Sequence, residues 1–205
     1  MFGGIMIMRK HAFTLSEVLI TLGVIGVVAT ITMPLIIKNV QKYVLKNQFK
    51  KSYNTLSQAI QKTYSDSGYS LICVYEGGGG PKDDDCVEFQ EQLRKNLKII
   101  KICNRNAKRD GCIKDIKGQS SPAYWSQNEI DNINTVYVLQ DGTSIILYGS
   151  GSSAPIFIVD VNGTKSPNKW GYDIFGFYNS KYTLKCYGEY VEDGGSKCSD
   201  LILKP

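Results

Sequence analysis

The stretch RKHAFTLSEVLITLGVIGVVATITMP, residues 9–34, decides the fold of this chain. Two basic residues, Arg9 and Lys10, precede a long apolar run that contains a single carboxylate, Glu17. The run 13–37 has 25 residues. As a helix it would span about 37 Å, which is enough to cross a bilayer. The sequence therefore predicts a membrane-spanning helix near the N-terminus.

Glu17 is the unusual residue of this span. A charged group near the middle of a membrane helix costs roughly 2.5 to 3.5 kcal/mol on insertion scales, so it indicates a functional residue with a partner. A secretory signal is cleaved after its apolar region, whereas the basic-to-apolar junction here lies before the run. Cleavage between Ala12 and Phe13 would free an α-amino group four residues before Glu17, and the two opposite charges would then be able to pair.

The segment RKHAFTLSEVLITL, followed by Gly23, Gly26 and Pro34, resembles the N-terminus of type IV pilins and of the pseudopilins of type II secretion systems. The resemblance implies a leader, residues 1–12, that a prepilin peptidase removes. Ala12 occupies the last leader position, where the family usually has glycine, and both residues are small.

By the same resemblance, Phe13 becomes the N-methylated first residue of the mature chain. Glu17 would contact the Phe13 amine of a neighbouring subunit during filament assembly. The partners implied are other pilin or pseudopilin subunits, membrane lipid and an inner-membrane assembly platform.

Gly26 and Pro34 lie inside the predicted span and have two interpretations. Small residues and prolines are common in membrane helices, which is the simpler one. Because Pro34 removes a backbone donor, the stretch between Gly26 and Pro34 is also predicted to loosen when the subunit leaves lipid for a filament core.

Arg9 and Lys10 favour a cytoplasmic N-terminus under the positive-inside rule. We therefore expect a single-pass protein of the inner membrane with its C-terminal domain in the periplasm. The mature form would then belong to a pilus or pseudopilus, with exposure at the cell surface in the first case.

Residues 38–67 continue the helix as an amphipathic half. Apolar residues repeat there at steps of four, three, four and four: Phe49, Tyr53, Leu56, Ile60 and Tyr64. No glycine or proline interrupts the sequence between Pro34 and Gly68, so a single helix is predicted to run to about Ser67. Its apolar stripe is expected to pack under a sheet.

Residues 68–205 form the predicted soluble head. A short helix is expected over 84–97, with Cys86, Phe89, Leu93 and Leu97 on one face. The Asp141-Gly142 turn between 135–139 and 144–148 predicts a hairpin. Residues 155–161 and 173–178 supply two more strands. The expected class is α+β: a long N-terminal helix packed on an antiparallel meander of about four strands, as in the pilin fold.

The six cysteines all follow the membrane span: Cys73, Cys86, Cys103, Cys112, Cys186 and Cys198. An even number in an exported domain favours disulfides, and six cysteines allow 15 pairings. Pairing of neighbours along the chain is our hypothesis because it closes short loops. The resemblance supports the last pair, since many pilins close a C-terminal loop with a disulfide. Zinc is disfavoured because no C-x-x-C spacing occurs and the only histidine, His11, lies in the leader.

The same lack of histidine argues against a Ser-His or Cys-His nucleophile in the mature chain, so we expect no enzyme. No cofactor is expected. Calcium is the one metal considered, because the loop DVNGTKSPNKWGYD carries the oxygen-bearing residues Asp160, Asn162, Asn168 and Asp173. Those residue types also favour turns for conformational reasons. The resemblance adds that some secretion pseudopilins bind calcium in a C-terminal loop.

From Gly68 to about Ala123 the chain shows no clear periodicity, and a stretch rich in bases follows the expected helix: Lys98, Lys101, Arg105, Lys108, Arg109, Lys114 and Lys117. A charge run is usually a solvated face, and Glu91, Asp110 and Asp115 dilute this one, so DNA is an unlikely partner. The sequence thus favours a structural pilin-like subunit. Two alternatives remain: a minor pilin for DNA uptake, and a signal-anchored periplasmic binding domain that does not polymerise.

Overall fold

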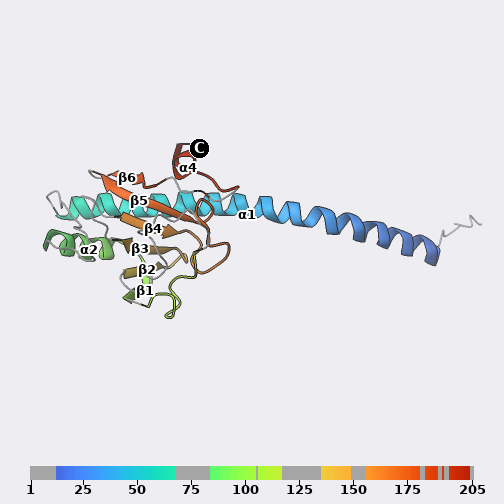
Figure 1. Cartoon of the computed structure of the whole chain (residues 1–205), viewed down its shortest axis with the longest axis horizontal. Helices are drawn as coiled ribbons and strands as arrows, with labels where there is room; N and C mark the ends of the chain where they lie inside the picture. The colour runs from blue at the N-terminus through green and yellow to red at the C-terminus, as the bar shows by residue number, and fades with distance from the viewer. Residues whose placement is uncertain are drawn as a thin grey trace, which may run out of the picture. The chain divides into compact units, whose positions relative to one another are not determined.

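The computed structural model describes residues 13–67, 84–104, 106–116, 135–148, 156–180, 183–188, 191 and 194–203. The helices are α1 (Leu15–Ser67), α2 (Asp84–Asn96) and α4 (Cys198–Leu203). The strands are β1 (Ile99–Asn104), β2 (Thr135–Leu139), β3 (Ser144–Tyr148), β4 (Ile156–Asp160), β5 (Ile174–Ser180) and β6 (Thr183–Cys186) (Figure 1). The chain divides into two units, Met1–Gln41 and Lys42–Pro205.

The six strands form one antiparallel sheet in the order β1-β2-β3-β4-β5-β6. Each strand therefore pairs with its neighbour in sequence, which is a meander. The predicted hairpin is present: Val136 faces Ile146 across β2 and β3, and Gly142 takes a positive φ of 88° in the turn. The predicted α+β class, with a long helix and an antiparallel sheet, is confirmed.

The expected number of about four strands was wrong, because β1 and β6 were not foreseen. In β1 a register shift between Ile99 and Lys101 interrupts the alternation of buried and exposed side chains by which a strand is recognised. With only four residues, β6 is too short to show a period. The six-residue α4 was missed for the same reason.

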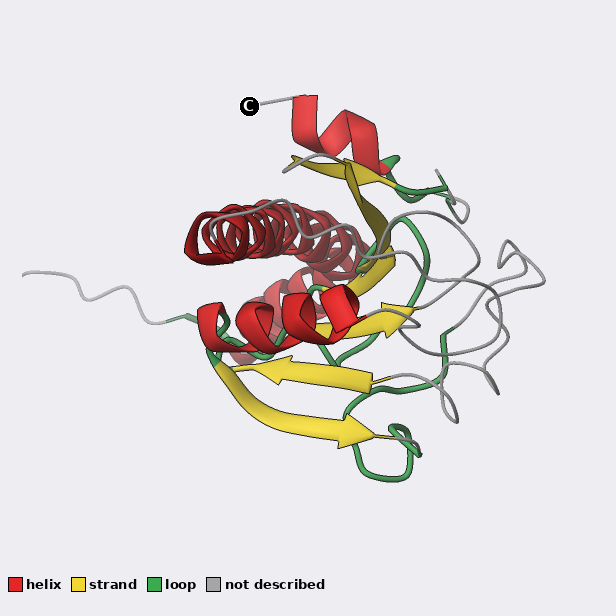
Figure 2. Ribbon diagram, turned by 90° about the vertical axis from the view of Figure 1, so that its left-hand side faces the viewer, coloured by secondary structure: helices red, strands yellow, loops and turns green. Residues whose placement is uncertain are grey.

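The main core lies between the helices and one face of the sheet (Figure 2). Phe49, Leu56 and Ile60 of α1 are each 1% exposed or less, as their spacing predicted. The ring of Phe49 meets that of Phe175 edge to face, with centroids 4.5 Å apart. Phe89 and Leu93 of α2, with Leu97 just after its end, join the same core. Burial of this apolar stripe explains why residues 45–63 of α1 form part of a folded domain.

A second core covers the other face of the sheet. Its largest member is Trp170, and its strand residues include Val136, Ile146 and Ile158. Cys103 and Cys112 belong to this cluster and are bonded to each other. The sheet is therefore buried on both faces, by helices on one side and by the segments around residues 107–116 and 170–174 on the other.

Candidate functional site

Thr14 and Glu17 bond to each other where α1 begins. Glu17 Oε2 accepts hydrogen bonds from the Thr14 backbone N–H and the Thr14 hydroxyl, both at 2.8 Å. In return, Thr14 Oγ1 accepts a bond from the Glu17 backbone N–H at 3.2 Å. This arrangement is a capping box, which satisfies donors left free at a helix N-terminus. Sequence reasoning did not identify Thr14, although Thr-x-x-Glu ahead of an apolar run is the pattern of such a box.

The capping box uses only one oxygen of the Glu17 carboxylate. In the part of the chain that the structure describes, Oε1 makes no hydrogen bond. Phe13 lies one residue before the box and is 86% exposed. Ala12 lies outside the described residues, so the cleavage point itself is not placed. An external amine therefore has an exposed carboxylate oxygen available to it, and pairing with the Phe13 amine of a neighbour stays a prediction.

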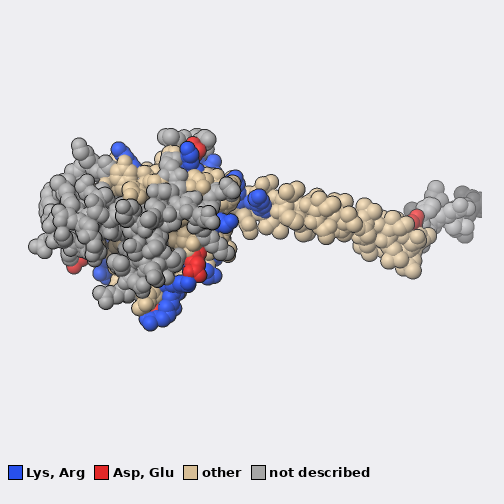
Figure 3. Space-filling model, in the orientation of Figure 1, with Lys and Arg blue, Asp and Glu red and all other residues tan. Residues whose placement is uncertain are grey.

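The N-terminal half of α1 is apolar on every side. It contains a segment long and apolar enough to cross a membrane. Side chains around its whole circumference are exposed, among them Leu19 (62%), Ile25 (63%) and Ile31 (65%). Figure 3 shows this stretch as a surface almost free of charge. Such a surface requires lipid or other apolar helices around it.

The threonine hydroxyl groups in this half of α1 form hydrogen bonds within the helix. Thr21, Thr30 and Thr32 donate to backbone carbonyls three or four residues earlier, at 2.8 to 2.9 Å. The helix continues through Pro34 without interruption. A Cβ added at Gly26 would meet no atom within 4 Å, so this position leaves room for another chain to approach. The proposed loosening between Gly26 and Pro34 stays a prediction.

A second candidate site is the oxygen-lined loop, which we define as Asp160, Asn162, Asn168 and Asp173. These residues lie at the end of β4 and in its connection to β5. All four are buried, with exposures of 4%, 9%, 3% and 0%. The loop is fixed against the β2–β3 turn: Gly163 has φ +65°, and a Cβ there would lie 2.2 Å from the Gly142 carbonyl oxygen. Only glycine fits this approach.

Backbone groups hold the two carboxylates of the loop. Asp173 accepts bonds from the backbone N–H groups of Asn168 (2.8 Å) and Lys169 (2.7 Å), and Asp160 accepts one from Asn162 (3.2 Å). The amide oxygens behave differently. In the described part of the chain, Asn162 Oδ1 and Asn168 Oδ1 are buried and have no hydrogen-bond partner. Buried acceptors of this kind usually have a partner, so the loop has unused capacity to accept a donor or a cation.

Burial raises the pKa of Asp160 well above its ordinary value, and the nearby charge of Asp173 raises it further. The pKa of Asp173 is also raised by burial, which outweighs the bonds from Lys169, Asn168 and Asn162 that act to lower it. Two buried carboxylates whose pKa values are raised would be stabilised in their ionised form by a cation bound to both. Hard oxygen donors without nitrogen or sulfur fit calcium. Among the described residues, no group of three or more acidic, histidine or cysteine side chains is placed to hold a metal, so the amide oxygens would have to contribute.

Two of the three expected disulfides are formed, Cys103–Cys112 and Cys186–Cys198. They close loops with sequence separations of 9 and 12 residues. The third expected pair falls outside the description, because Cys73 lies beyond the described residues and the side chain of Cys86 is not described. The Cys186–Cys198 bond ties β6 to the first residue of α4.

The basic stretch is partly neutralised by its own acids. Lys108 pairs with Asp115, and Arg109 pairs with Asp110 at 3.2 Å. Lys101 donates to the backbone carbonyl of Asp110. Arg105 and Lys117 lie outside the described residues. No described feature of this stretch favours DNA over solvent.

Comparison with known proteins gives one match. Residues 7–33 match the family model described as the prokaryotic N-terminal methylation motif, which is the prepilin-type cleavage and methylation signal of type IV pilins and pseudopilins. The matched segment contains the predicted cleavage point, Phe13, the capping box and most of the apolar span. A search of curated proteins and a search of solved structures returned no significant match.

Proposed function

We propose that this chain is a structural, non-catalytic subunit that polymerises into a type IV pilus or a type II secretion pseudopilus. A prepilin peptidase would remove residues 1–12 and methylate Phe13. The observation that carries the proposal is the methylation motif at residues 7–33, whose helix is apolar and exposed on all sides. Before assembly, the subunit would reside in the inner membrane with its head in the periplasm. The assembly platform would then transfer it to the filament.

The capping box gives Glu17 two tasks in this proposal. Through Oε2 it holds the first turn of its own helix. Through Oε1 it would receive the methylated Phe13 amine of the neighbouring subunit. An amine and a carboxylate that pair in an apolar filament core no longer carry unpaired charge, so the contact favours the filament over the lone membrane helix.

The N-terminal peptide tests the proposal directly. We would analyse it by mass spectrometry in surface material sheared from native cells and in the membrane pellet of the same cells. A peptide that begins at N-methylated Phe13 in the sheared fraction supports a surface pilin, and the same peptide confined to the pellet supports a pseudopilin or a minor subunit. An uncut leader in both fractions would overturn the proposal in favour of a simple membrane anchor.

Two substitutions at Glu17 separate its charge from its capping role. Glu17→Gln keeps an acceptor that can complete a capping box but removes the charge. Glu17→Ala removes both. We expect normal cleavage and strongly reduced filament yield from both variants, measured by quantitative blotting of sheared material. A normal yield from Glu17→Gln would show that the charge pair is dispensable.

We also propose that the oxygen-lined loop binds calcium. The two amide oxygens without partners and the two carboxylates with raised pKa values support this assignment. Calcium titration of the detergent-solubilised full chain, followed by differential scanning calorimetry, should raise the melting temperature of the head. Magnesium is the control cation, because it demands a tighter octahedral geometry and loses water reluctantly. Calcium should not stabilise Asp173→Asn, and an equal response in that variant would exclude the loop as the site.

A further inference from the structure

Helix α1 carries lysines over a long stretch without any acid. Between Glu17 and Asp66 the sequence contains no aspartate or glutamate, but it contains lysines at positions 38, 42, 46, 50, 51 and 62. Three of them, Lys42, Lys46 and Lys50, recur every four residues and belong to the second unit. Residues with this spacing lie along one side of a helix. We call these three residues the lysine stripe.

The positive charges of the lysine stripe have no partner among the described residues. None of its three lysines forms an ion pair or a hydrogen bond there. By contrast, the next lysine, Lys51, pairs with Asp141 at 3.1 Å, and Lys62 pairs with Asp66 at 2.7 Å. Lys42, at the start of the stripe, is exposed. The charge of the stripe is therefore available to an anionic partner outside the chain.

The lysine stripe follows the apolar run of residues 13–37 closely. Lys42 comes five residues after the end of this run, or about 8 Å of helix, and the headgroup layer of a bilayer is roughly 5 to 8 Å thick. Figure 3 shows basic side chains directly after the apolar stretch of α1. Tyr43, beside Lys42, is 68% exposed. Tyrosine is enriched at the headgroup level, where its ring meets apolar chains and its hydroxyl meets water.

We propose that the lysine stripe binds the phosphate groups of anionic phospholipids in the membrane that the chain spans. Lysines next to a membrane-spanning helix are attracted to anionic lipid, and the attraction falls off within a Debye length of the surface. It should therefore decrease from Lys42 to Lys46 to Lys50. The inference rests on the membrane residence in the proposed function. It adds the class of lipid that the subunit prefers and a contact that holds the head at the membrane before assembly.

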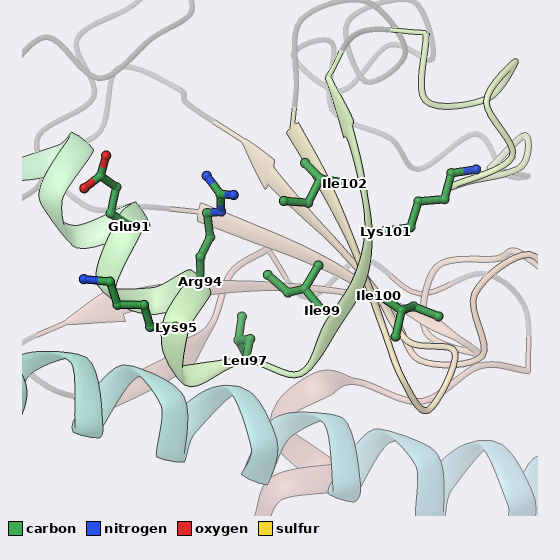
Figure 4. A pocket seen from close by; sticks show the side chains of 8 residues that line it. All are labelled: Glu91, Arg94, Lys95, Leu97, Ile99, Ile100, Lys101 and Ile102. Carbon is green, nitrogen blue, oxygen red and sulfur yellow. The ribbon is translucent and has the colours of Figure 1, made fainter.

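Two cations at the end of α2 provide a matched control. Arg94 and Lys95 line a hollow of about 560 Å³ beside β1 (Figure 4). The next residue, Asn96, donates to Thr63 Oγ1 of α1 at 3.2 Å. Thr63 follows Lys46 by 17 residues, or about 26 Å of helix. This length is more than twice the Debye length of about 10 Å at 0.1 M salt, so Arg94 and Lys95 should not contribute to lipid binding.

Spin-labelled lipids test the inference in the full chain. The chain would be reconstituted in phosphatidylcholine vesicles with a trace of spin-labelled phosphatidylglycerol or phosphatidylcholine. Electron paramagnetic resonance then measures the fraction of each label that the protein immobilises. We expect wild-type chain to associate at least about threefold more strongly with phosphatidylglycerol. Lys42→Gln with Lys46→Gln should remove most of this preference. Arg94→Gln with Lys95→Gln removes the same charge and should keep it. The leader, residues 1–12, is the same in all three chains.

Several results would overturn the inference. Equal association of the two lipids with the wild-type chain would show that the stripe does not select anionic lipid. An equal loss of preference in both double variants would show that only net charge matters. Inorganic phosphate that removes the preference more than sodium chloride of the same ionic strength would indicate a site for free phosphate. A carbodiimide link from Lys42 or Lys46 to a carboxylate of a second chain, with no lipid preference, would assign the stripe to a protein partner.

The same vesicles separate this inference from the proposed function. A chain that an alkaline wash removes from the vesicles does not span the membrane, and the proposed function would then fail. A chain that stays in the vesicles without lipid preference would contradict only the lipid contact. Salt at about 0.5 M should reduce the preference and leave the chain inserted, since it screens exposed charges but not apolar burial. Lys50→Gln should reduce the preference less than Lys42→Gln does.

Discussion

The two units of this chain differ in whether their apolar side chains are buried. In the described residues of the second unit, 42–205, most large apolar side chains are buried in two clusters, one on each face of the sheet. In the described residues of the first unit, 13–41, no side chain is buried, and the exposed ones include Leu15, Ile20, Val24 and Ile36. The first unit therefore gains nothing from its apolar groups until lipid or another copy covers them.

The two parts of one helix therefore present different surfaces. In residues 42–67, α1 has an apolar face that matches the sheet and a polar face that matches water. In residues 13–41 it has no polar face, and Glu17 and Lys38 are the only ionisable side chains. Substitutions in the head should therefore change its stability, while substitutions in the first unit should change assembly.

Core truncation in the head should have the largest effect on stability. Phe177 is 1% exposed, and its ring lies 5.9 Å from those of Phe49 and Tyr53. Phe177→Ala should lower the free energy of unfolding by about 3 to 5 kcal/mol, because it leaves a cavity between α1 and β5. Urea unfolding followed by near-ultraviolet circular dichroism would measure it.

Ile25→Ala is the matched truncation in the first unit. Ile25 is 63% exposed, so the melting temperature of the head should stay unchanged while filament yield falls. Equal destabilisation of the head by Ile25→Ala and Phe177→Ala would contradict the division into an independent head and an assembly-dependent helix.

Loss of the Cys186–Cys198 bond should have the second-largest effect on the stability of the head. The bond closes a loop with a separation of 12 residues and fixes α4 to β6. Replacing both cysteines with serine should cost about 3 kcal/mol of head stability, mainly through the freedom gained by the unfolded chain. Thermal melting is the measurement, and Ser199→Ala, next to Cys198, is the control. An unchanged melting temperature in the double variant would show that packing alone holds α4.

Sequence reasoning succeeded where one residue type or one period fixes the structure. The Asp141-Gly142 turn identified the hairpin, and the stripe of Phe49, Leu56 and Ile60 identified the buried face of α1. It failed at β1, where the register shift beside Lys101 hides the period, and at the short β6. Both missed strands lie at the edges of the sheet, where one neighbour is absent and the burial pattern is weakest.

The candidate sites were predictable to different degrees. Local spacing pointed to Phe13 and Glu17, and the same spacing contained Thr14, whose hydroxyl completes the capping box. The oxygen-lined loop was suggested by residue types alone. Its unpartnered amide oxygens, on Asn162 and Asn168, depend on how the connection between β4 and β5 folds, and no local pattern encodes that.

The remaining predicted effect concerns pH, and it sharpens the contrast between a head with buried titrating groups and a helix with almost none. Asp160 and Asp173 have pKa values raised above 3.8 in the folded state. Between pH 3.8 and the folded pKa values, these two groups bind more protons in the folded head than in the unfolded chain, so their contribution to stability is lost as pH rises through the folded pKa values. The slope is at most about 1.4 kcal/mol per pH unit for each proton.

Asp66 and Asp141 have the opposite pH dependence. Their pKa values are lowered in the folded state, so the stability that they contribute is lost as pH falls below 3.8. Urea unfolding between pH 4 and 7 therefore isolates the oxygen-lined loop. Asp160→Asn should reduce the slope, since an amide does not titrate and only Asp173 of the buried pair remains to do so. Calcium should flatten it in the wild-type head, because a bound cation favours both ionised carboxylates and lowers their pKa values. A slope that is as steep in Asp160→Asn as in the wild-type chain would show that Asp160 is not a titrating group. A slope that calcium leaves unchanged would mean that protons alone neutralise the buried pair.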